Sequence, residues 1–220
     1  FPTRRSSDLD GSFFVTVLIG LFSLINPLGA LTVYLTLTHE FSEDQKLQTL
    51  KKTCIYIFII CITSYYVGVY ILNFFGISIP ALRLAGGLVI FRSGWQLLNV
   101  THKKELRNSI REDSNQREDI SFSPLAMPLL AGPGSMSFLI TLFSNRSEQW
   151  STAIIQDAYA VLAILIVVIA LYFIFKYAPR LIRYTGQSGL LALSKIMGFI
   201  VIGIGVQMII NSLIVFSKSL

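Results

Sequence analysis

The stretch from Phe13 to Thr38 is apolar and contains no Asp, Glu, Lys or Arg. In a helix that rises about 1.5 Å per residue, this length crosses a hydrocarbon core roughly 30 Å thick. The motif Asn26-Pro27-Leu28-Gly29 interrupts it near its centre. Proline removes a backbone donor, and a carbonyl freed at mid-membrane needs protein or a polar cavity beside it. We therefore expect a broken membrane helix, with Asn26 as the N-cap of a half-helix that starts at Pro27.

A second interruption lies in another stretch without charged residues, 122–143, which contains Pro128 and the motif Gly132-Pro133-Gly134-Ser135. Pro133 follows Pro27 by 106 residues. Gly132 is expected at the cap position of a second half-helix and Pro133 in its first turn. The N-terminus of each half-helix directs free N–H groups and a positive dipole end toward the bilayer centre. Interrupted segments in matching positions of two halves are typical of a transporter's central site.

These two breaks supply the candidate substrate-binding residues. They are Asn26, Pro27, Gly29, Gly132, Pro133, Gly134 and Ser135.

The composition agrees with a membrane protein, because 53% of the residues are hydrophobic, 14% are charged and the mean hydropathy is +0.65. A soluble domain is usually less apolar and more charged. The predicted fold class is all-α integral membrane, with six transmembrane helices of which the first and fourth are broken. The predicted spans are about 13–38, 54–74, 79–99, 122–143, 153–175 and 195–216.

The basic residues are distributed unequally among the connections between these spans. Eleven Lys and Arg residues fall in the connections 39–53, 101–121 and 176–194, against one in the other two. This asymmetry places the three basic connections in the cytoplasm and both termini on the periplasmic side. The net charge of +6 therefore indicates membrane orientation and not a nucleic-acid partner.

The chain divides into two halves, 11–100 and 122–220, joined by the hydrophilic cytoplasmic linker 101–121. Residues 1–10 are set apart as a non-native leader, since Phe1–Leu9 resembles translated cloning sequence. With three spans in each half, the second half enters from the opposite side, so a repeat would be inverted. At an offset of 112, Arg83, Gly86 and Asn99 match Lys195, Gly198 and Asn211, which is weak support for a repeat because chance can produce three matches in an apolar background.

Three charged residues within the spans are candidates for a gate or for coupling: Arg83, Arg92 and Asp157. A charge inside a bilayer costs about 2.5 to 3.5 kcal/mol and usually faces the bundle interior or water. The alternative for both arginines is that the long side chain reaches the membrane surface. The alternative for Asp157 is that it lies in the first turn of its helix, where its negative charge interacts favourably with the helix dipole.

Glycines are frequent in the third and sixth spans, which predicts central helices packed closely against the two broken ones. No catalytic motif is present, so an enzyme is not expected. Cys54 and Cys61 fall seven residues apart without a second pair or a nearby His. Neither a metal site nor another cofactor is therefore expected.

Four stretches of the sequence together resemble the MarC family, also called UPF0056. They are FFVTVLIGLFSLINPLGALTVYLTLT, RLAGGLVIFRSGWQLL, SPLAMPLLAGPGSMSFLITL and KIMGFIVIGIGVQMIIN. The most specific marks are NPLGA at 26–30 and PLLAGPGS at 128–135. The resemblance implies two inverted three-helix repeats, a bacterial inner-membrane location and kinship with exporters of small solutes and carriers of neutral amino acids such as glycine and alanine. Thr32 departs from the family pattern, in which a proline is expected soon after the NPLG motif.

The resemblance and the residues together predict a secondary transporter of small neutral amino acids that works by alternating access. The carboxylate would bind the N–H groups at the half-helix starts, and the ammonium would bind carbonyls before the breaks, at Ile25, Asn26, Ala131 and Gly132. Its partners would be the substrate and the lipid bilayer, with a homo-oligomer left open. The alternatives are an exporter of another small polar or anionic solute, and a membrane scaffold that transports nothing.

Overall fold

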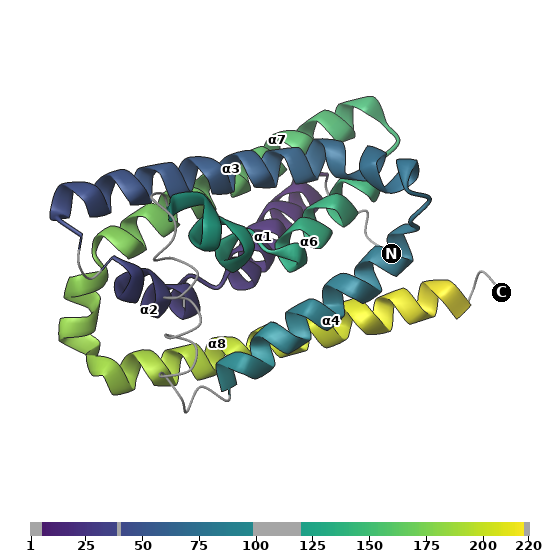
Figure 1. The fold of residues 1–220 in the computed structure, drawn as a ribbon. Coiled ribbons are helices and arrows are strands. Elements are labelled where there is room, and N and C mark those ends of the chain that lie inside the picture. Colours follow the sequence, from purple (N-terminus) through teal and green to yellow (C-terminus); the bar gives the residue numbers. More distant parts are fainter. Residues whose placement is uncertain (1–5, 39–40, 99–119, 218–220) are drawn as a thin grey trace.

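A computed structural model describes residues 6–38, 41–98 and 120–217, and within these ranges the chain forms helices and turns without a strand. Eight helical elements follow one another in the order shown in Figure 1. They are α1 (Ser6–Ile25), α2 (Pro27–Leu37), α3 (Glu43–Phe74), α4 (Ile79–Leu98), η1 (Ser121–Leu130), α6 (Pro133–Ser144), α7 (Trp150–Lys176) and α8 (Ala178–Ser217). The predicted linker 101–121 lies, apart from its last two residues, outside the described ranges.

Three of the described helical stretches are long and apolar enough to cross a membrane: Glu43–Phe74, Trp150–Lys176 and Lys195–Ser217. The two stretches Gly11–Ile25 and Pro133–Ser144 are apolar but shorter. Each of these shorter helices ends or begins at one of the predicted breaks, which is why neither reaches full membrane length. The predicted all-helical class is therefore confirmed within the described ranges, with three helices of membrane length.

Two predicted connections are helical in the structure. Most of 39–53 belongs to α3, which begins at Glu43 because Ser42 and Gln45 form a capping box: the Ser42 hydroxyl accepts from the Gln45 N–H and the Gln45 side chain accepts from the Ser42 N–H. Most of 176–194 belongs to α8, which begins at Ala178 directly after α7. Pro179 is its second residue, and proline is tolerated in a first turn.

The buried core lies where α1, α3, α7 and the second broken segment meet. Helix α3 packs against α6, α7 and η1, and α1 packs against α7. Fully buried side chains come from each of these elements, among them Leu21, Ile57, Tyr65, Leu125, Leu139 and Ile164. The core therefore surrounds the segment of each half that contains a break.

Helices α4 and α8 form a close antiparallel pair (Figure 1). A Cβ atom placed on Gly87 would lie 2.8 Å from the Gly205 carbonyl oxygen, and one on Gly205 would lie 2.8 Å from the Gly87 oxygen. A Cβ on Gly94 would lie 2.7 Å from the Gly198 oxygen. These distances leave room only for hydrogen, so the backbones touch at glycines. The sequence predicted that these glycines pack against the broken helices, whereas Gly87, Gly94, Gly198 and Gly205 pack the two glycine-rich helices against each other.

The α4–α8 pair is joined to the broken segments through α4. Gly86 of α4 faces Ser137 of α6, and Gly134 of α6 faces Ile90 of α4. The Ser137 hydroxyl also donates to the Leu82 carbonyl at 3.2 Å. Helix α4 therefore packs along the half-helix that starts at Pro133, while α8 contacts α2.

The substitution Gly94→Ala is expected to destabilise the protein, because its methyl group would lie against the backbone of α8. We expect a loss of about 1 to 3 kcal/mol, as for other overpacked interiors, and a lower midpoint of thermal unfolding in detergent. Gly11→Ala in α1 is the matched control, since a Cβ there meets nothing within 4 Å. Equal midpoints for the two variants would contradict the packing described here.

Candidate functional site

The first break is centred on Asn26. Helix α1 ends at Ile25, α2 begins at Pro27, and Asn26 between them has a φ of +48°. Asparagine is among the few residues that adopt this left-handed conformation readily, and it often ends a helix in it. The Asn26 N–H donates to the Phe22 carbonyl at 3.1 Å, and the Asn26 carbonyl accepts from the Ala30 N–H at 3.2 Å. The predicted break is confirmed, and Asn26 both closes α1 and opens α2, where we expected it only to cap α2.

The second break lies at Ala131 and Gly132. Gly132 has an extended backbone (φ −87°, ψ 177°) and is the N-cap of α6, and Pro133 is the first helical residue. Both positions are as predicted. The preceding element η1 is an irregular π-type segment with extended backbone at Ser123 and Met127. Each of these residues precedes a proline, which disfavours the helical conformation, so this crossing is disrupted over a longer stretch than we expected.

The two broken segments run antiparallel with their halves paired. Helix α1, before the first break, packs against α6, after the second, and α2 packs against η1 (Figure 1). The close approach of α1 to α6 occurs at Gly20, where a Cβ would lie 2.9 Å from the Phe138 ring. Ile25 and Ala131, the residues that end the first half of each segment, are both buried. The residue directly before each break therefore lies inside the bundle, as does Pro27 after the first break.

The predicted binding residues differ in exposure. Pro27, Gly134 and Ser135 are buried, Asn26 and Gly132 are half-buried, and Pro133 is exposed. Gly29 lies in the first turn of α2. By helix geometry the first N–H groups of α2 and α6 have no acceptor within their own helices. They are the donors that an anionic group would use.

Two of the four carbonyls expected to bind an ammonium are already hydrogen-bonded. The Gly132 carbonyl accepts from the Met136 N–H at 3.1 Å and from the Ser135 hydroxyl at 2.9 Å. The Asn26 carbonyl accepts from Ala30. A carbonyl oxygen has two lone pairs, so Gly132 has none left for a cation. This part of the prediction is wrong for Gly132 and weakened for Asn26, because each carbonyl also opens the following helix.

Ser23 is a polar residue near the break that sequence reasoning missed. It lies one turn before Asn26 and is 6% exposed. Its hydroxyl is buried in an otherwise apolar part of α1. A hydroxyl one turn from a predicted break was the signal that could have identified it.

Arg83 turns toward the second broken segment. Its side chain is half-buried, and Nε donates to the Thr141 hydroxyl of α6 at 3.3 Å. Arg92, further along α4, is exposed, and among the described residues we find no hydrogen bond or ion pair of its side chain. Only Arg83 of the two arginines is therefore brought against a half-helix.

Asp157 lies at the centre of a polar cluster that ties three parts of the chain together. The Tyr65 hydroxyl of α3 donates to Oδ1 at 2.8 Å, and Arg146 Nη1 lies 3.1 Å from Oδ2. The Arg146 guanidinium also lies 4.1 Å from the ring centre of Phe143, at the end of α6. Helix α7 begins at Trp150, so Asp157 is its eighth residue. The expectation that Asp157 sits in a first turn is wrong, since that helix starts earlier than predicted.

The aromatic residues of α3 divide between the core and the surface. Tyr65 is fully buried, whereas Tyr70 is 64% exposed and Trp150 of α7 is 82% exposed. The rings of Tyr65 and Phe143 meet edge to face with centres 5.3 Å apart. Tyr65 and Arg146 are functional candidates that sequence reasoning missed, because partners of Asp157 that lie 92 and 11 residues away leave no local signal.

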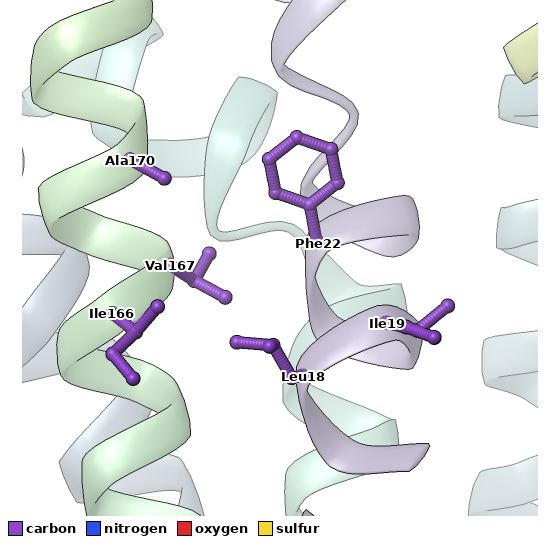
Figure 2. Close-up of a pocket in the computed structure, with 6 residues that line it drawn as sticks. All are labelled: Leu18, Ile19, Phe22, Ile166, Val167 and Ala170. Atoms are coloured by element: carbon purple, nitrogen blue, oxygen red, sulfur yellow. The ribbon is translucent and has the colours of Figure 1, made fainter. Parts of the chain in front are cut away.

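A cavity of about 290 Å³ lies between α1 and α7, with entirely apolar side chains around it. Figure 2 shows Leu18 and Phe22 of α1 beside Val167 and Ala170 of α7. Such a lining offers no partner to the charges of a zwitterion. It is suited to an apolar chain and includes none of the predicted binding residues.

Within the described ranges, no group of three or more His, Cys, Asp or Glu side chains is placed to hold a metal ion. The polar side-chain groups at the two breaks are hydroxyls and amides, and the broken backbone adds peptide dipoles that can bind a polar ligand.

Two broken helices, each of which restarts at a proline, pack against each other within an apolar helical bundle. This arrangement defines a multi-pass membrane protein whose central helices are discontinuous. The profile of MarC family integral membrane proteins matches residues 11–216, so this chain belongs to the MarC family. A UPF0056 membrane protein of Methanocaldococcus jannaschii is 32% identical over 206 residues, which cover 93% of this chain and 98% of the relative. The UPF0056 inner membrane protein MarC of Escherichia coli O1:K1 is 32% identical over 209 residues, covering 92% and 94%. No solved structure matches the chain.

Removing the charge of Asp157 is expected to loosen the cluster. Asp157→Asn, Arg146→Gln and Tyr65→Phe should each lower the midpoint of thermal unfolding in detergent, by the equivalent of about 1 to 3 kcal/mol for a hydrogen bond to a charged group, less for the partly exposed Arg146. Glu148→Gln is the control, since Glu148 is an exposed carboxylate in the same connection. The double variant Asp157→Asn/Arg146→Gln should cost less than the sum of its parts. Additive costs would show that the pair is not coupled.

Proposed function

We propose that this protein is a secondary transporter of small neutral amino acids such as glycine and alanine. The observation that carries the proposal is the antiparallel pairing of two broken helices, each of which restarts at a proline next to the break. Discontinuous helices with N-termini at mid-membrane hold substrate carboxylates in several transporter folds. Membership of the MarC family supports a membrane role but leaves the solute unspecified.

A small zwitterion suits the chemistry of this centre. The substrate carboxylate would accept hydrogen bonds from the N–H groups of Gly134, Ser135 and the first turn of α2, where the helix dipoles also favour negative charge. The ammonium would bind the Asn26 side-chain oxygen and the carbonyls of Ile25 and Ala131. Gly132 and Ser135 would hold the second half-helix in position through their mutual hydrogen bond. The absence of a charged residue from both break motifs suits a substrate without net charge.

We further propose that the six crossings form two inverted three-helix repeats, in a bacterial inner membrane and with both termini periplasmic. The pairing of elements supports this arrangement, because exchanging the halves turns α1–α6 into η1–α2, α3–η1 into α7–α1 and α4–α6 into α8–α2, all of which pack together. The glycines agree, since Gly198 follows Gly87 and Gly205 follows Gly94 by the same 111 residues. This offset differs by one residue from the 112 used in the sequence comparison.

In this scheme Arg83 and the Asp157 cluster are gate residues. Arg83 binds one end of α6 to α4, and Arg146 with Phe143 binds the same end to α3 and α7. Movement of α6 relative to those helices would require these contacts to change. Asp157 is the carboxylate through which a proton could be coupled to that movement, whereas Arg92 is the weaker candidate because it is exposed.

An exporter of another small polar or anionic solute is the second candidate, because half-helix N-termini favour any compact anion. The two candidates differ in the need for an ammonium acceptor. A carrier for zwitterions should discriminate against acetate and lactate, whereas an anion exporter should accept them.

Transport by purified protein in proteoliposomes tests the proposal. We expect saturable counterflow of labelled glycine or alanine. Asn26→Ala and Gly132→Leu should reduce it by about ten- to a hundredfold, since each disturbs hydrogen bonds to a charged substrate. Phe199→Leu is the control, because Phe199 is 72% exposed on α8 and away from both breaks. Undiminished flux in both break variants would refute the site, and absence of flux for every amino acid and small anion would refute the carrier.

A further inference from the structure

Helix α8 carries two rows of residues with the spacing of a helix-packing seam. One row faces α4 and consists of Gly198, Ile202, Gly205 and Ile209, all of which contact glycines or Phe91 of α4. Its steps of four, three and four residues are those of helices that pack at a small crossing angle. This inner row is therefore filled within the chain.

The second row lies on the other side of α8, and we call it the outer seam. It consists of Ile196, Ile200, Gly203, Gln207, Ile210 and Ile214, with steps of four, three, four, three and four residues. Gly203 and Gln207 lie two residues before and after Gly205, so each is turned about 160° away from the face that meets α4. Every residue of the outer seam is exposed. The Lys195–Ser217 span is only 17% buried, against 33% and 39% for the other two membrane-length helices.

The outer seam has an amide at its centre. Gln207 is the thirteenth residue of the 23-residue span Lys195–Ser217, which places it near the middle of the membrane. Its Nε2 donates to Oδ1 of Asn211 at 2.9 Å. The Gln207 oxygen and both N–H groups of Asn211 have no other partner within the described part of the chain. Isoleucine side chains can face lipid without a free-energy penalty, whereas amide groups that face hydrocarbon without hydrogen-bond partners are destabilising.

We propose that the outer seam is the interface of a two-fold dimer, in which α8 packs against α8 of a second copy of this chain. Copies inserted in the same orientation bring their α8 helices together in parallel, with position 207 opposite its counterpart. An amide both donates and accepts, so it is complementary to itself across a two-fold axis. Amides at a seam also fix the register of paired helices.

Gly203 supports close approach at the same place. It lies one turn from Gln207, and a Cβ built on it meets nothing within 4 Å. The tightly packed glycines Gly87, Gly94 and Gly205 already have neighbours, whereas Gly203 has an open side that faces outward. A small residue beside an amide lets two helix backbones come near enough for the side chains to bond. This inference is independent of the proposed transport activity.

Disulfide cross-linking in native membranes tests the interface directly. Ile210→Cys should form a cross-linked dimer on mild oxidation. Leu165→Cys on α7 is the matched control, because Ile210 is 45% exposed and Leu165 is 42% exposed, each in the middle of an apolar helix. The native Cys54 and Cys61 are buried, so they need not be removed. Cross-linking that is no more frequent at position 210 than at 165 would overturn the proposal.

Subunit counting of the full chain in vesicles of defined protein-to-lipid ratio provides the second measurement. Gln207→Leu should weaken the dimer about five- to thirtyfold, the equivalent of one interhelical amide contact in model helices. Leu165→Ala on α7, outside the outer seam, should leave it unchanged. Monomers at every protein-to-lipid ratio would overturn the proposal. So would a Gln207→Leu variant that dimerises normally and loses only solute flux, because that result would assign the amides to the solute pathway.

Discussion

The structure depends on the need to satisfy backbone polar groups inside a membrane. A helix that crosses without interruption satisfies its own N–H and C=O groups, whereas a helix broken at Asn26 or Gly132 frees several of them where no lipid can bind them. Part of the demand is met locally, by the Asn26 carbonyl bonded to Ala30 and by the Gly132 carbonyl bonded to Ser135 and Met136. The remaining N–H groups require other protein groups, water or a solute.

Much of the surrounding packing follows from this requirement. Each broken segment is placed against the other, and α3, α7 and the α4–α8 pair enclose them. The glycine contacts hold α4 and α8 together as a closely packed pair. Gly86, Ile90 and Arg83 of α4 connect this pair to α6. The far end of α6 is held by Phe143 and by the cluster at Asp157. The half-helix α6 is therefore held near both ends, by Ile90 against Gly134 and by Arg83 and the cluster at Asp157 near its C-terminus.

The sequence was sufficient to predict the features that depend on local chemistry. The break positions follow from proline and glycine in runs without charge, and the capping role of Gly132 follows from the proline after it. The family is recognisable from the same motifs. Features that depend on residues far apart were missed: the pairing of Tyr65 and Arg146 with Asp157, and the contact of Arg83 with Thr141. The extent of α8 was also missed, because Pro179 was interpreted as part of a connection when it occupies a first helical turn.

The central claim is that the starts of α2 and α6 face a common hydrated space that holds the solute. Substrate-protected labelling of Pro133→Cys tests it most directly, because Pro133 is exposed at the first position of α6 whereas the two native cysteines are buried. The account predicts that a small water-soluble thiol reagent modifies this cysteine in transport-active vesicles and that glycine or alanine slows the reaction. A cysteine at this position that stays unmodified from both sides of the membrane while transport continues would contradict it.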